Sequence, residues 1–284
     1  MMTDEKRRIV DAVSGSRRYR AVAPAVIERL AGEELSRART TDEAIKRVKR
    51  RLHQSVGAYA PMSWADPHAD LARLRAALAQ PVHDTEVRAA CARLMARHAS
   101  TRERLPHLDR FYAGIWEAIG GLPGSLLDLG CGLAPLALPW MGLAHDAFYQ
   151  AVDVDAAQLA LVDGFLDLAG QPHAIEARDL AATIGPPIPA ADVALLLKLV
   201  PILDRQDPIA AARLLSGLPA QHAVVSFPAR SLGGRGKGMD RTYRHRLETL
   251  LTEVEPKVVS VAEASVPNEL VFVLSLAPLR TADG

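Results

Sequence analysis

A pair of glycines and three acidic residues are the side chains of this sequence whose types and spacing point to chemistry. Residues 125–140, SLLDLGCGLAPLALPW, begin as an apolar run, reach Asp128 and turn through Gly130 and Gly132. Glycine permits positive φ and lets a ligand approach the backbone closely. A dinucleotide-binding turn, G-x-G-x-x-G, would have glycine where this chain has Pro135, and a carboxylate beside the turn would repel a pyrophosphate. The turn therefore favours a ligand that carries positive charge and no phosphate.

S-adenosylmethionine (SAM) has these properties, because it carries an ammonium and a sulfonium and lacks a phosphate. Asp153 follows Gly132 by 21 residues, a position where an acid accepts hydrogen bonds from a ribose diol. Asp179, followed by Leu180, offers an acceptor and an apolar contact to an adenine ring. Capping a helix N-terminus is the competing role for such acids, and we expect it for Asp155 and keep it open for Asp179. Together the turn and the acids predict a SAM pocket.

The elements that carry these residues change in character after residue 124. Up to about residue 119 the pattern is helical. In residues 41–59, apolar positions recur at three- and four-residue steps behind a suitable N-cap, Thr41. The last helical segment, residues 100–121, contains Pro106, where we expect a kink, and ends at its final two glycines. The N-terminal part is therefore predicted to be all helical.

Short apolar runs alternate with amphipathic stretches in the rest of the chain. The runs are residues 125–129, 147–152, 173–177, 193–197, 223–227, 258–261 and 270–276. This alternation predicts an α/β fold with a doubly wound, mostly parallel sheet. The link between the last two runs is too short for a parallel crossover, so we expect an antiparallel edge strand. Ligands bind beyond the carboxyl ends of such strands, which is where the glycine turn and Asp153 would meet.

Composition and charge narrow the class of protein. The 284 residues are 49% hydrophobic and 24% charged, without an apolar run long enough to span a membrane. The two cysteines have no metal-ligand spacing, so we expect a reduced, cytoplasmic protein that binds neither metal nor membrane. Residues 1–110 carry 22 Lys and Arg against 14 Asp and Glu, and residues 230–246 carry six against one. These two basic regions, on an otherwise acidic chain, indicate a polyanionic partner.

The methyl acceptor is constrained by motifs that the sequence lacks. Exocyclic amines of bases are commonly handled by a [DN]-P-P-[YF] loop after the fourth strand, where this chain reads LLLKLVPILD. Carbon-5 of a pyrimidine requires a cysteine nucleophile, but Cys91 lies in a helical pattern and Cys131 lies within the glycine turn. A purine ring nitrogen such as guanine N7 has no proton to remove. The sequence favours that acceptor, with a positioning mechanism and no catalytic residue.

Several segments resemble one family, the aminoglycoside-resistance methyltransferases that modify N7 of guanine 1405 in 16S ribosomal RNA. The matching segments are RRYRAVAPAVIERL, KRRLHQSVGAY, HASTRERLPHLDRFY, LLDLGCGLAPLALPWM, ARDL and VVSFPARSLGGRGKGM. The resemblance implies a class I SAM-dependent methyltransferase fold, Rossmann-like with a seven-stranded sheet, behind an N-terminal all-helical domain. We expect a helical RNA- or ribosome-binding domain over residues 1–108 and a SAM-binding domain over residues 109–284.

The resemblance also implies which residues contact SAM. Asp128 and Gly132 of the turn join a set carried over from the motifs: Tyr59, His98, Ala99, Ser100, Arg102, Gly130, Asp153, Val154, Asp179, Leu180 and Gln206. Arg102 suits the methionine carboxylate, because a guanidinium can bind a carboxylate with two hydrogen bonds. A surface arginine in a charged turn is the alternative interpretation of Arg102.

The basic regions are expected to hold the RNA. The predicted contacts are Lys46, Arg47, Lys49, Arg50 and Arg51 in the N-terminal helices, and Arg235 and Lys237 in a glycine-rich loop. The simpler interpretation of the helical residues is the polar face of an amphipathic helix. Guanine N7 faces the deep major groove of A-form RNA, so the target base is expected to flip out of its stack.

The predicted function is methylation of guanine 1405 in the 30S subunit by a monomeric enzyme, which confers resistance to kanamycin and gentamicin. Three alternatives stay open at this point. The chain could instead methylate N1 of adenine 1408, bind ribosomes through a degenerate SAM fold without catalysis, or methylate a small molecule. The last leaves the two basic regions without a role.

Overall fold

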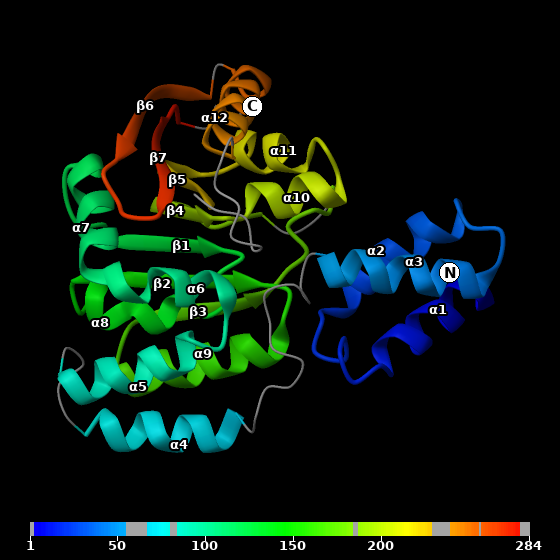
Figure 1. The fold of residues 1–284 in the computed structure, drawn as a ribbon, viewed down its shortest axis with the longest axis horizontal. Coiled ribbons are helices and arrows are strands. Elements are labelled where there is room, and N and C mark those ends of the chain that lie inside the picture. Colours follow the sequence, from blue (N-terminus) through cyan, green and yellow to red (C-terminus); the bar gives the residue numbers. More distant parts are fainter. Residues whose placement is uncertain are drawn as a thin grey trace, which may run out of the picture.

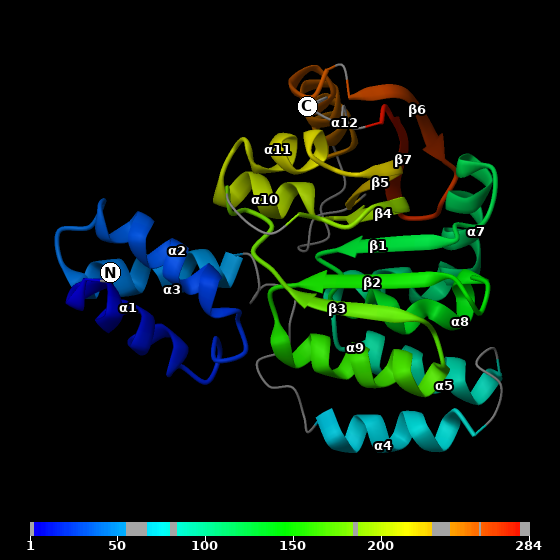
Figure 2. The same ribbon diagram turned by 180° about the vertical axis from the view of Figure 1, so that it is seen from behind.

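The computed structural model describes residues 3–54, 67–79, 84–183, 187–228, 239–255 and 257–278. Two parts are visible in Figure 1: a body built around one sheet, and a unit of three helices beside it, coloured blue. The opposite view in Figure 2 shows that the three-helix unit lies at the end of the sheet to which the arrowheads of β1, β2 and β3 point. In a parallel sheet this is the end where ligands bind.

The sheet has seven strands in the order β3-β2-β1-β4-β5-β7-β6. Their bounds are β1 Ser125–Leu129, β2 Phe148–Asp153, β3 His173–Ala177, β4 Ala191–Leu197, β5 Ala220–Pro228, β6 Val258–Ala264 and β7 Glu269–Leu276. Strands β1 to β5 pair in parallel, and β7 is antiparallel to both of its neighbours. The predicted seven strands and final hairpin are confirmed. The expected antiparallel edge strand is β6, which pairs with β7, while β7 inserts beside β5.

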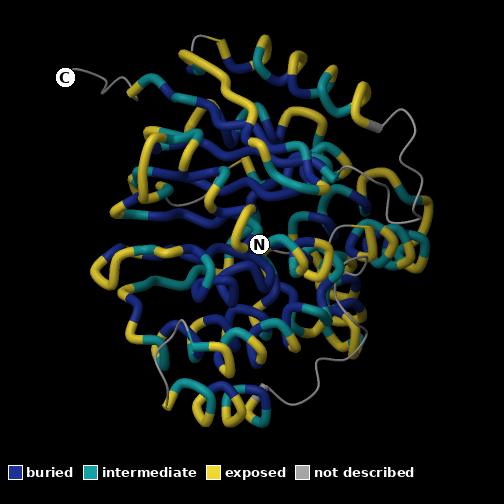
Figure 3. The backbone as a smooth tube through the Cα atoms, turned by 60° about the vertical axis from the view of Figure 1, so that its left-hand side comes forward, coloured by how far each residue is buried: buried dark blue, intermediate teal, exposed yellow. Residues whose placement is uncertain are grey.

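Alternate residues of the central strands enter two separate cores. Leu126 of β1 packs with Phe111 and Phe165 on one face, and Leu127 packs with Leu203 and Leu250 on the other. The first face is covered by α4 Pro67–Ala77, α5 Thr85–Met95, α7 Leu108–Ile119, η3 Ala134–Ala137, α8 Leu138–Met141 and α9 Ala156–Ala169. The second is covered by α10 Val200–Gln206, α11 Ala210–Ser216 and α12 Met239–Glu253. Burial on both faces explains why the central strands β1, β4 and β5 appear as continuous apolar runs, and Figure 3 shows that buried backbone runs through the middle of the molecule.

The three-helix unit has a hydrophobic core of its own. Its helices are α1 Asp4–Ser14, α2 Pro24–Leu35 and α3 Thr41–Leu52, and their core includes Ile9, Ile27 and Val48. In contrast, Leu74 of α4 and Cys91 of α5 belong to the core of the sheet. The change of core therefore lies between α3 and α4, earlier than the boundary expected at residues 108 and 109. Amphipathic periodicity predicts helices but does not show which core each helix joins.

The segment before the sheet breaks where the sequence predicts it. Helix α6 Ala99–Arg104 gives way to a 3-10 turn, η2 Leu105–His107, which contains Pro106, and α7 then runs to Ile119. Gly120 ends α7 in the left-handed conformation, with φ of 92°. His98 and Ser100, at the start of α6, line the same pocket as the glycine turn.

A buried ion pair fixes α6 to the sheet. Arg104 of α6 donates two hydrogen bonds to Glu269 of β7, at 2.8 and 2.6 Å, and Lys198 Nζ lies 3.5 Å from the same carboxylate. Burial alone would raise the pKa of Glu269, but the charges of Arg104 and Lys198 hold it below its ordinary value. Glu269 is therefore ionised at neutral pH, and its removal would leave the buried guanidinium of Arg104 without the carboxylate that it pairs with.

Replacing Glu269 with alanine should destabilise the fold by about 3–5 kcal/mol, the usual cost of breaking a buried pair from one side. Urea denaturation followed by circular dichroism measures this change in the free energy of unfolding. Glu263→Ala is the matched control, because Glu263 on the neighbouring strand is 46% exposed in its pair with Arg244, and exposed pairs contribute about 1 kcal/mol or less. Equal losses in the two variants would contradict the assignment.

Candidate active site

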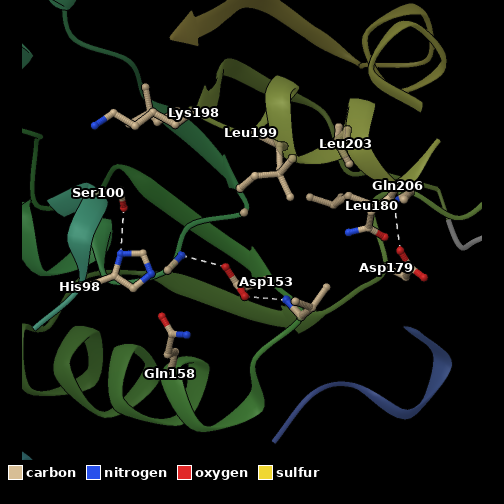
Figure 4. Close-up of a pocket in the computed structure, with 16 residues that line it drawn as sticks. His98, Ser100, Asp153, Gln158, Asp179, Leu180, Lys198, Leu199, Leu203 and Gln206 are labelled. Atoms are coloured by element: carbon tan, nitrogen blue, oxygen red, sulfur yellow. Dashed lines mark hydrogen bonds between the residues drawn. The ribbon is translucent and has the colours of Figure 1, made fainter. Parts of the chain in front are cut away.

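A pocket opens at the carboxyl ends of β1, β2, β3 and β4 (Figure 4). His98 and Ser100 lie at one end of it, and Asp179 and Gln206 lie at the other (Figure 4). The predicted residues that line it are His98, Ser100, Gly130, Gly132, Asp153, Val154, Asp179, Leu180 and Gln206. Segments far apart in the sequence are therefore brought together as the motifs predict.

The glycine turn after β1 forms the floor between these ends. Gly130 and Gly132 have φ of 68° and 51°, a region that side chains other than glycine rarely adopt. A Cβ on Gly130 would lie 2.9 Å from Cδ1 of Leu199, and one on Gly132 would lie 3.4 Å from the His98 ring. Both glycines are thus required by backbone conformation, and they keep the turn bare where it faces the pocket.

Asp153, the last residue of β2, holds the turn in place. Its Oδ2 accepts the N–H of Gly132 at 2.8 Å, and its Oδ1 accepts the N–H groups of Val154 at 2.7 Å and Asp155 at 3.0 Å. Burial raises the pKa of Asp153, and these backbone hydrogen bonds oppose the rise. A carboxylate has about four lone-pair sites, so acceptor capacity for a ligand hydroxyl is left. Asp155 caps α9 through the N–H groups of Ala157 and Gln158, as predicted.

Asp128 lies behind the turn and does not line the pocket. It is buried on β1, where its Oδ2 accepts a hydrogen bond of 2.7 Å from Tyr149 Oη. Burial raises the pKa of Asp128 to about 7, against the hydrogen bond from Tyr149 and the charge of Arg104, which lower it. Its predicted influence on the ligand is therefore electrostatic and acts through the turn.

Cofactor affinity should rise with pH because of Asp128. A cation in the pocket favours the ionised carboxylate and lowers its pKa, so binding releases a proton near neutral pH. The free protein binds this proton below its pKa of about 7, and SAM binding should therefore strengthen about three- to tenfold between about pH 6 and about pH 8. Calorimetry across this range measures the effect. Asp128→Asn should flatten the profile, and a flat wild-type profile would contradict the coupling.

His98 is a neutral ligand-facing group over the same range. Burial and the charges of Arg104 and Lys198 lower the pKa of His98 to about 4. Its Nδ1 lies 2.8 Å from Ser100 Oγ, a contact drawn in Figure 4. A neutral imidazole does not repel a cationic ligand, so the His98 end of the pocket suits the charged part of SAM.

Gln158 of α9 is a pocket residue that sequence reasoning missed. Its Nε2 donates to Asp155 Oδ2 at 3.0 Å, while its buried Oε1 accepts no hydrogen bond from any residue that the structure describes. An unpartnered buried acceptor facing a pocket calls for a donor from a ligand, and the ammonium of SAM is one. Together with the bare turn, this atom shows that the residues present fit SAM.

The remaining missed residues of the lining come from β4 and the segments around it. They are Ala181, Leu197, Lys198, Leu199, Ile202 and Leu203. Lys198 has a positive φ of 60°, uncommon for a residue with a side chain, and its Nζ donates to Glu103 at 2.6 Å. The apolar members suit an adenine ring. Neither the turn at Lys198 nor α10 is signalled by the run LLLKLVPILD.

Three predicted cofactor residues have other placements. Ala99 is the first residue of α6, next to two residues that line the pocket, but does not line it itself. Arg102 is exposed and also lies outside the lining. Tyr59 lies outside the described residues. Contacts of Arg102 and Tyr59 with SAM stay predictions.

The predicted RNA-binding residues of α3 divide into two groups. Arg47 donates to Glu34 at 2.7 Å, and Arg51 donates to Glu33 at 2.6 Å, so these two arginines hold α3 against α2. Lys46 and Arg50 are exposed and Lys49 is half-buried; none of the three forms an ion pair with the described part of the chain. Arg235 and Lys237 lie outside the described residues. The outward residues of α3 are thus the better candidates for an external partner.

No helix in the described part of the chain is long and apolar enough to cross a membrane. No group of three or more His, Cys, Asp or Glu residues there is arranged to hold a metal ion.

Known proteins resemble this chain over nearly its whole length. A protein from Frankia casuarinae named 16S rRNA (guanine(1405)-N(7))-methyltransferase is 41% identical over 268 residues, 94% of this chain and 92% of its own. One of the same name from Micromonospora echinospora is 39% identical over 273 residues, 95% and 97% of the two chains. The crystal structure of the 16S rRNA methyltransferase RmtF with S-adenosyl-L-homocysteine is 33% identical, with a TM-score of 0.78 over 98% of this chain and 100% of that one.

The sheet order, the bare turn and the acids at the strand ends are those of a SAM-dependent methyltransferase. The model of one family, described as ribosomal RNA methyltransferase (FmrO), matches residues 15–273. This match covers both the three-helix unit and the sheet with its pocket. The chain belongs to the ribosomal RNA methyltransferase (FmrO) family.

Proposed function

We propose that the protein transfers a methyl group from SAM to N7 of guanine 1405 in 16S ribosomal RNA, within the 30S subunit. The observation that carries the proposal is the pocket at the carboxyl ends of β1 to β4, where the Gly130–Gly132 turn, Asp153 and the unpartnered Gln158 Oε1 meet. The choice of guanine 1405 is supported by relatives near 40% identity that are named 16S rRNA (guanine(1405)-N(7))-methyltransferase. We further propose that the protein acts as a monomer in the cytoplasm.

SAM supplies an activated methyl group for in-line displacement at carbon. The chain's part is to hold the donor and acceptor in line, which is the main demand of such a reaction. Asp153 fixes the turn and offers acceptor capacity, Gln158 offers a second acceptor, and neutral His98 adds no positive charge. Guanine N7 has a lone pair and no proton, so no general base is required. The predicted absence of a catalytic residue is part of this proposal.

The RNA is held by positive charge on the three-helix unit. Lys46, Lys49 and Arg50 share α3, which lies in the unit beside the pocket end of the sheet (Figure 2). Phosphate contacts position a protein on RNA without reading its sequence. Recognition of a unique nucleotide then needs the shape of the assembled subunit, so we propose the 30S particle rather than bare RNA as the substrate.

The product explains resistance to drugs. Methylation places a positive charge on guanine and removes the N7 acceptor. Aminoglycosides are polycations that hydrogen-bond in the decoding site, so the added like charge and the missing acceptor weaken their binding. Guanine modification should protect against kanamycin and gentamicin.

Expression of the chain in a susceptible bacterial host tests this proposal through a drug panel. Growth in kanamycin and gentamicin with continued sensitivity to apramycin is the expected result. Added resistance to apramycin would indicate adenine 1408 instead. Unchanged sensitivity to all three drugs, with the protein expressed and folded, would count against both methylations.

A further inference from the structure

The three-helix unit is bonded to the wall of the cofactor pocket at two places. Residues before α2 pair with the end of β2: Ala23 N–H donates to Val154 O at 2.7 Å, and Ala156 N–H donates to Ala21 O at 2.8 Å. Arg29 of α2 reaches the opposite end of the pocket. The unit is therefore in contact with both the Val154 side and the Asp179 side of the same cavity.

Arg29 is bonded to two pocket residues at once. Its Nε donates to Asp179 Oδ2 at 2.6 Å, and its Nη2 donates to Asp179 Oδ1 at 3.2 Å and to Gln206 Oε1 at 2.6 Å. Its Nη1 donates to Glu33 at 2.8 Å, which holds the guanidinium from its own helix. The Arg29 side chain is 17% exposed and that of Asp179 is 5% exposed, so solvent screens this pair only weakly.

These bonds decide what the two pocket residues can offer a ligand. A guanidinium has donors only, so the oxygen of the Gln206 amide must face Arg29, and both N–H donors of that amide remain for another partner. Asp179 accepts from Arg29 on both oxygens and from the Ala181 N–H at 3.1 Å on Oδ1. About one of the four lone-pair sites of the carboxylate is then left, on Oδ2.

One amide donor beside one carboxylate acceptor complements the edge of adenine. That edge carries an exocyclic amine, which donates, next to a ring nitrogen, which accepts. Hypoxanthine has a carbonyl in place of the amine and a protonated ring nitrogen beside it, so the same pair of protein groups would face it with reversed polarity. Figure 4 shows Gln206 and Asp179 side by side at one end of the pocket.

We propose that Arg29 is a positioning residue that sets the Gln206–Asp179 pair to recognise adenine, and that it thereby couples cofactor binding to docking of the three-helix unit. The inference rests on the proposed function for the identity of the cofactor. The coupling is reciprocal. By thermodynamic linkage, if docking of the three-helix unit strengthens cofactor binding, cofactor binding strengthens docking of the unit by the same factor. Cofactor binding then stabilises the docked position of the unit that carries Lys46, Lys49 and Arg50 before RNA binds.

Calorimetry with S-adenosylhomocysteine and its inosine analogue tests the adenine part. The wild type should prefer the adenosine form. Arg29→Gln should weaken binding of S-adenosylhomocysteine about tenfold and reduce the preference for it over the inosine analogue. The affinities of Arg29→Lys should lie between those of the wild type and Arg29→Gln. Arg8→Gln is the matched control, because Arg8 pairs with Asp42 in the same unit and is 66% exposed; its affinities should equal those of the wild type. Equal loss of both ligands in Arg29→Gln would overturn a role in recognition, as would unchanged affinity.

Gln206→Leu tests the same adenine recognition if Arg29→Gln is unstable. Gln206→Leu removes the amide that Arg29 orients, so it should reduce the preference for adenine by the same factor, and adding Arg29→Gln should cause little further loss. Fully additive losses would show that the two residues act separately. If the wild type binds neither ligand, the proposed cofactor is wrong, whereas wild-type binding with an unaltered Arg29 variant overturns only the role of Arg29.

Hydrogen exchange tests the coupling part. S-adenosylhomocysteine should slow amide exchange in α2 of the wild type and leave it unchanged in Arg29→Gln. Protection of the Gly130–Gly132 turn serves as the internal control, because it reports occupancy of the pocket in both proteins. If S-adenosylhomocysteine protects the turn of the wild type but leaves amide exchange in its α2 unchanged, the coupling is overturned.

Discussion

Replacing Asp153 with alanine should weaken SAM binding by about 100-fold or more and abolish methyl transfer. The carboxylate accepts three backbone N–H groups of the turn and the next segment, and we propose that it also accepts the ribose hydroxyls. A hydrogen bond to a charged group contributes about 1.5–3 kcal/mol, so the removal of one ligand bond, together with the three bonds that hold the turn, accounts for the expected change in affinity. Calorimetry with SAM measures it directly.

The control for this variant is Asp167→Ala. Asp167 lies on α9, close to Asp153 in the sequence, but its side chain is 74% exposed and outside the pocket. Its removal should leave SAM affinity unchanged. Asp153→Ala that folds and binds SAM as tightly as the wild type would refute the assignment of the pocket.

Replacing Lys46, Lys49 and Arg50 together with alanine should reduce binding to 30S subunits about tenfold or more and spare SAM affinity. For each phosphate that the variant no longer neutralises, the slope of log affinity against log salt should fall by about one. Filter binding at several salt concentrations gives both quantities. The same number of charges removed from Arg75, Arg93 and Arg110, exposed residues of α4, α5 and α7, elements that lie away from the three-helix unit (Figure 1), provides the control.

The two triple variants separate a local contact from a general effect of charge. If both weaken 30S binding equally, net charge rather than α3 is responsible. Arg47 and Arg51 are left out of the test because their ion pairs with Glu33 and Glu34 join α3 to α2, so their loss would disturb the fold as well as any RNA contact.

The strands and helix ends could be predicted because each depends on the residue types of its own segment. The central strands are buried on two faces and therefore form continuous apolar runs, and the run at residues 125–129 coincides with β1. Pro106 and Gly120 interrupt helices through their own backbone restrictions. The order of β6 and β7 in the sheet depends on pairing between distant strands, which the short link between them does not specify.

The pocket was predictable where backbone conformation or position at a strand end required a residue type. Gly130, Gly132 and Asp153 are such residues. Gln158 and Lys198 were missed because a glutamine in a helix and a lysine after an apolar run have many uses, and only the tertiary structure shows which one applies. Arg29 is a further case: its helix has an amphipathic pattern, but its partners Asp179 and Gln206 lie 150 and 177 positions away.

The basic residues of α3 also show what sequence patterns cannot predict. Lys46, Arg47, Lys49, Arg50 and Arg51 are alike in sequence, and all were predicted to contact RNA. The structure turns Arg47 and Arg51 toward the buried Glu34 of α2, a partner that periodicity alone does not identify. Net charge therefore predicted the kind of partner but not which side chains are available to it.

Incubation of assembled 30S subunits with the protein and SAM, followed by mass mapping of 16S RNA, is the most direct test of methylation at guanine 1405. The proposed function predicts one added methyl group, at N7 of guanine 1405, and its absence with Asp153→Ala. Methylation at adenine 1408, or unmodified RNA despite bound SAM, would contradict it.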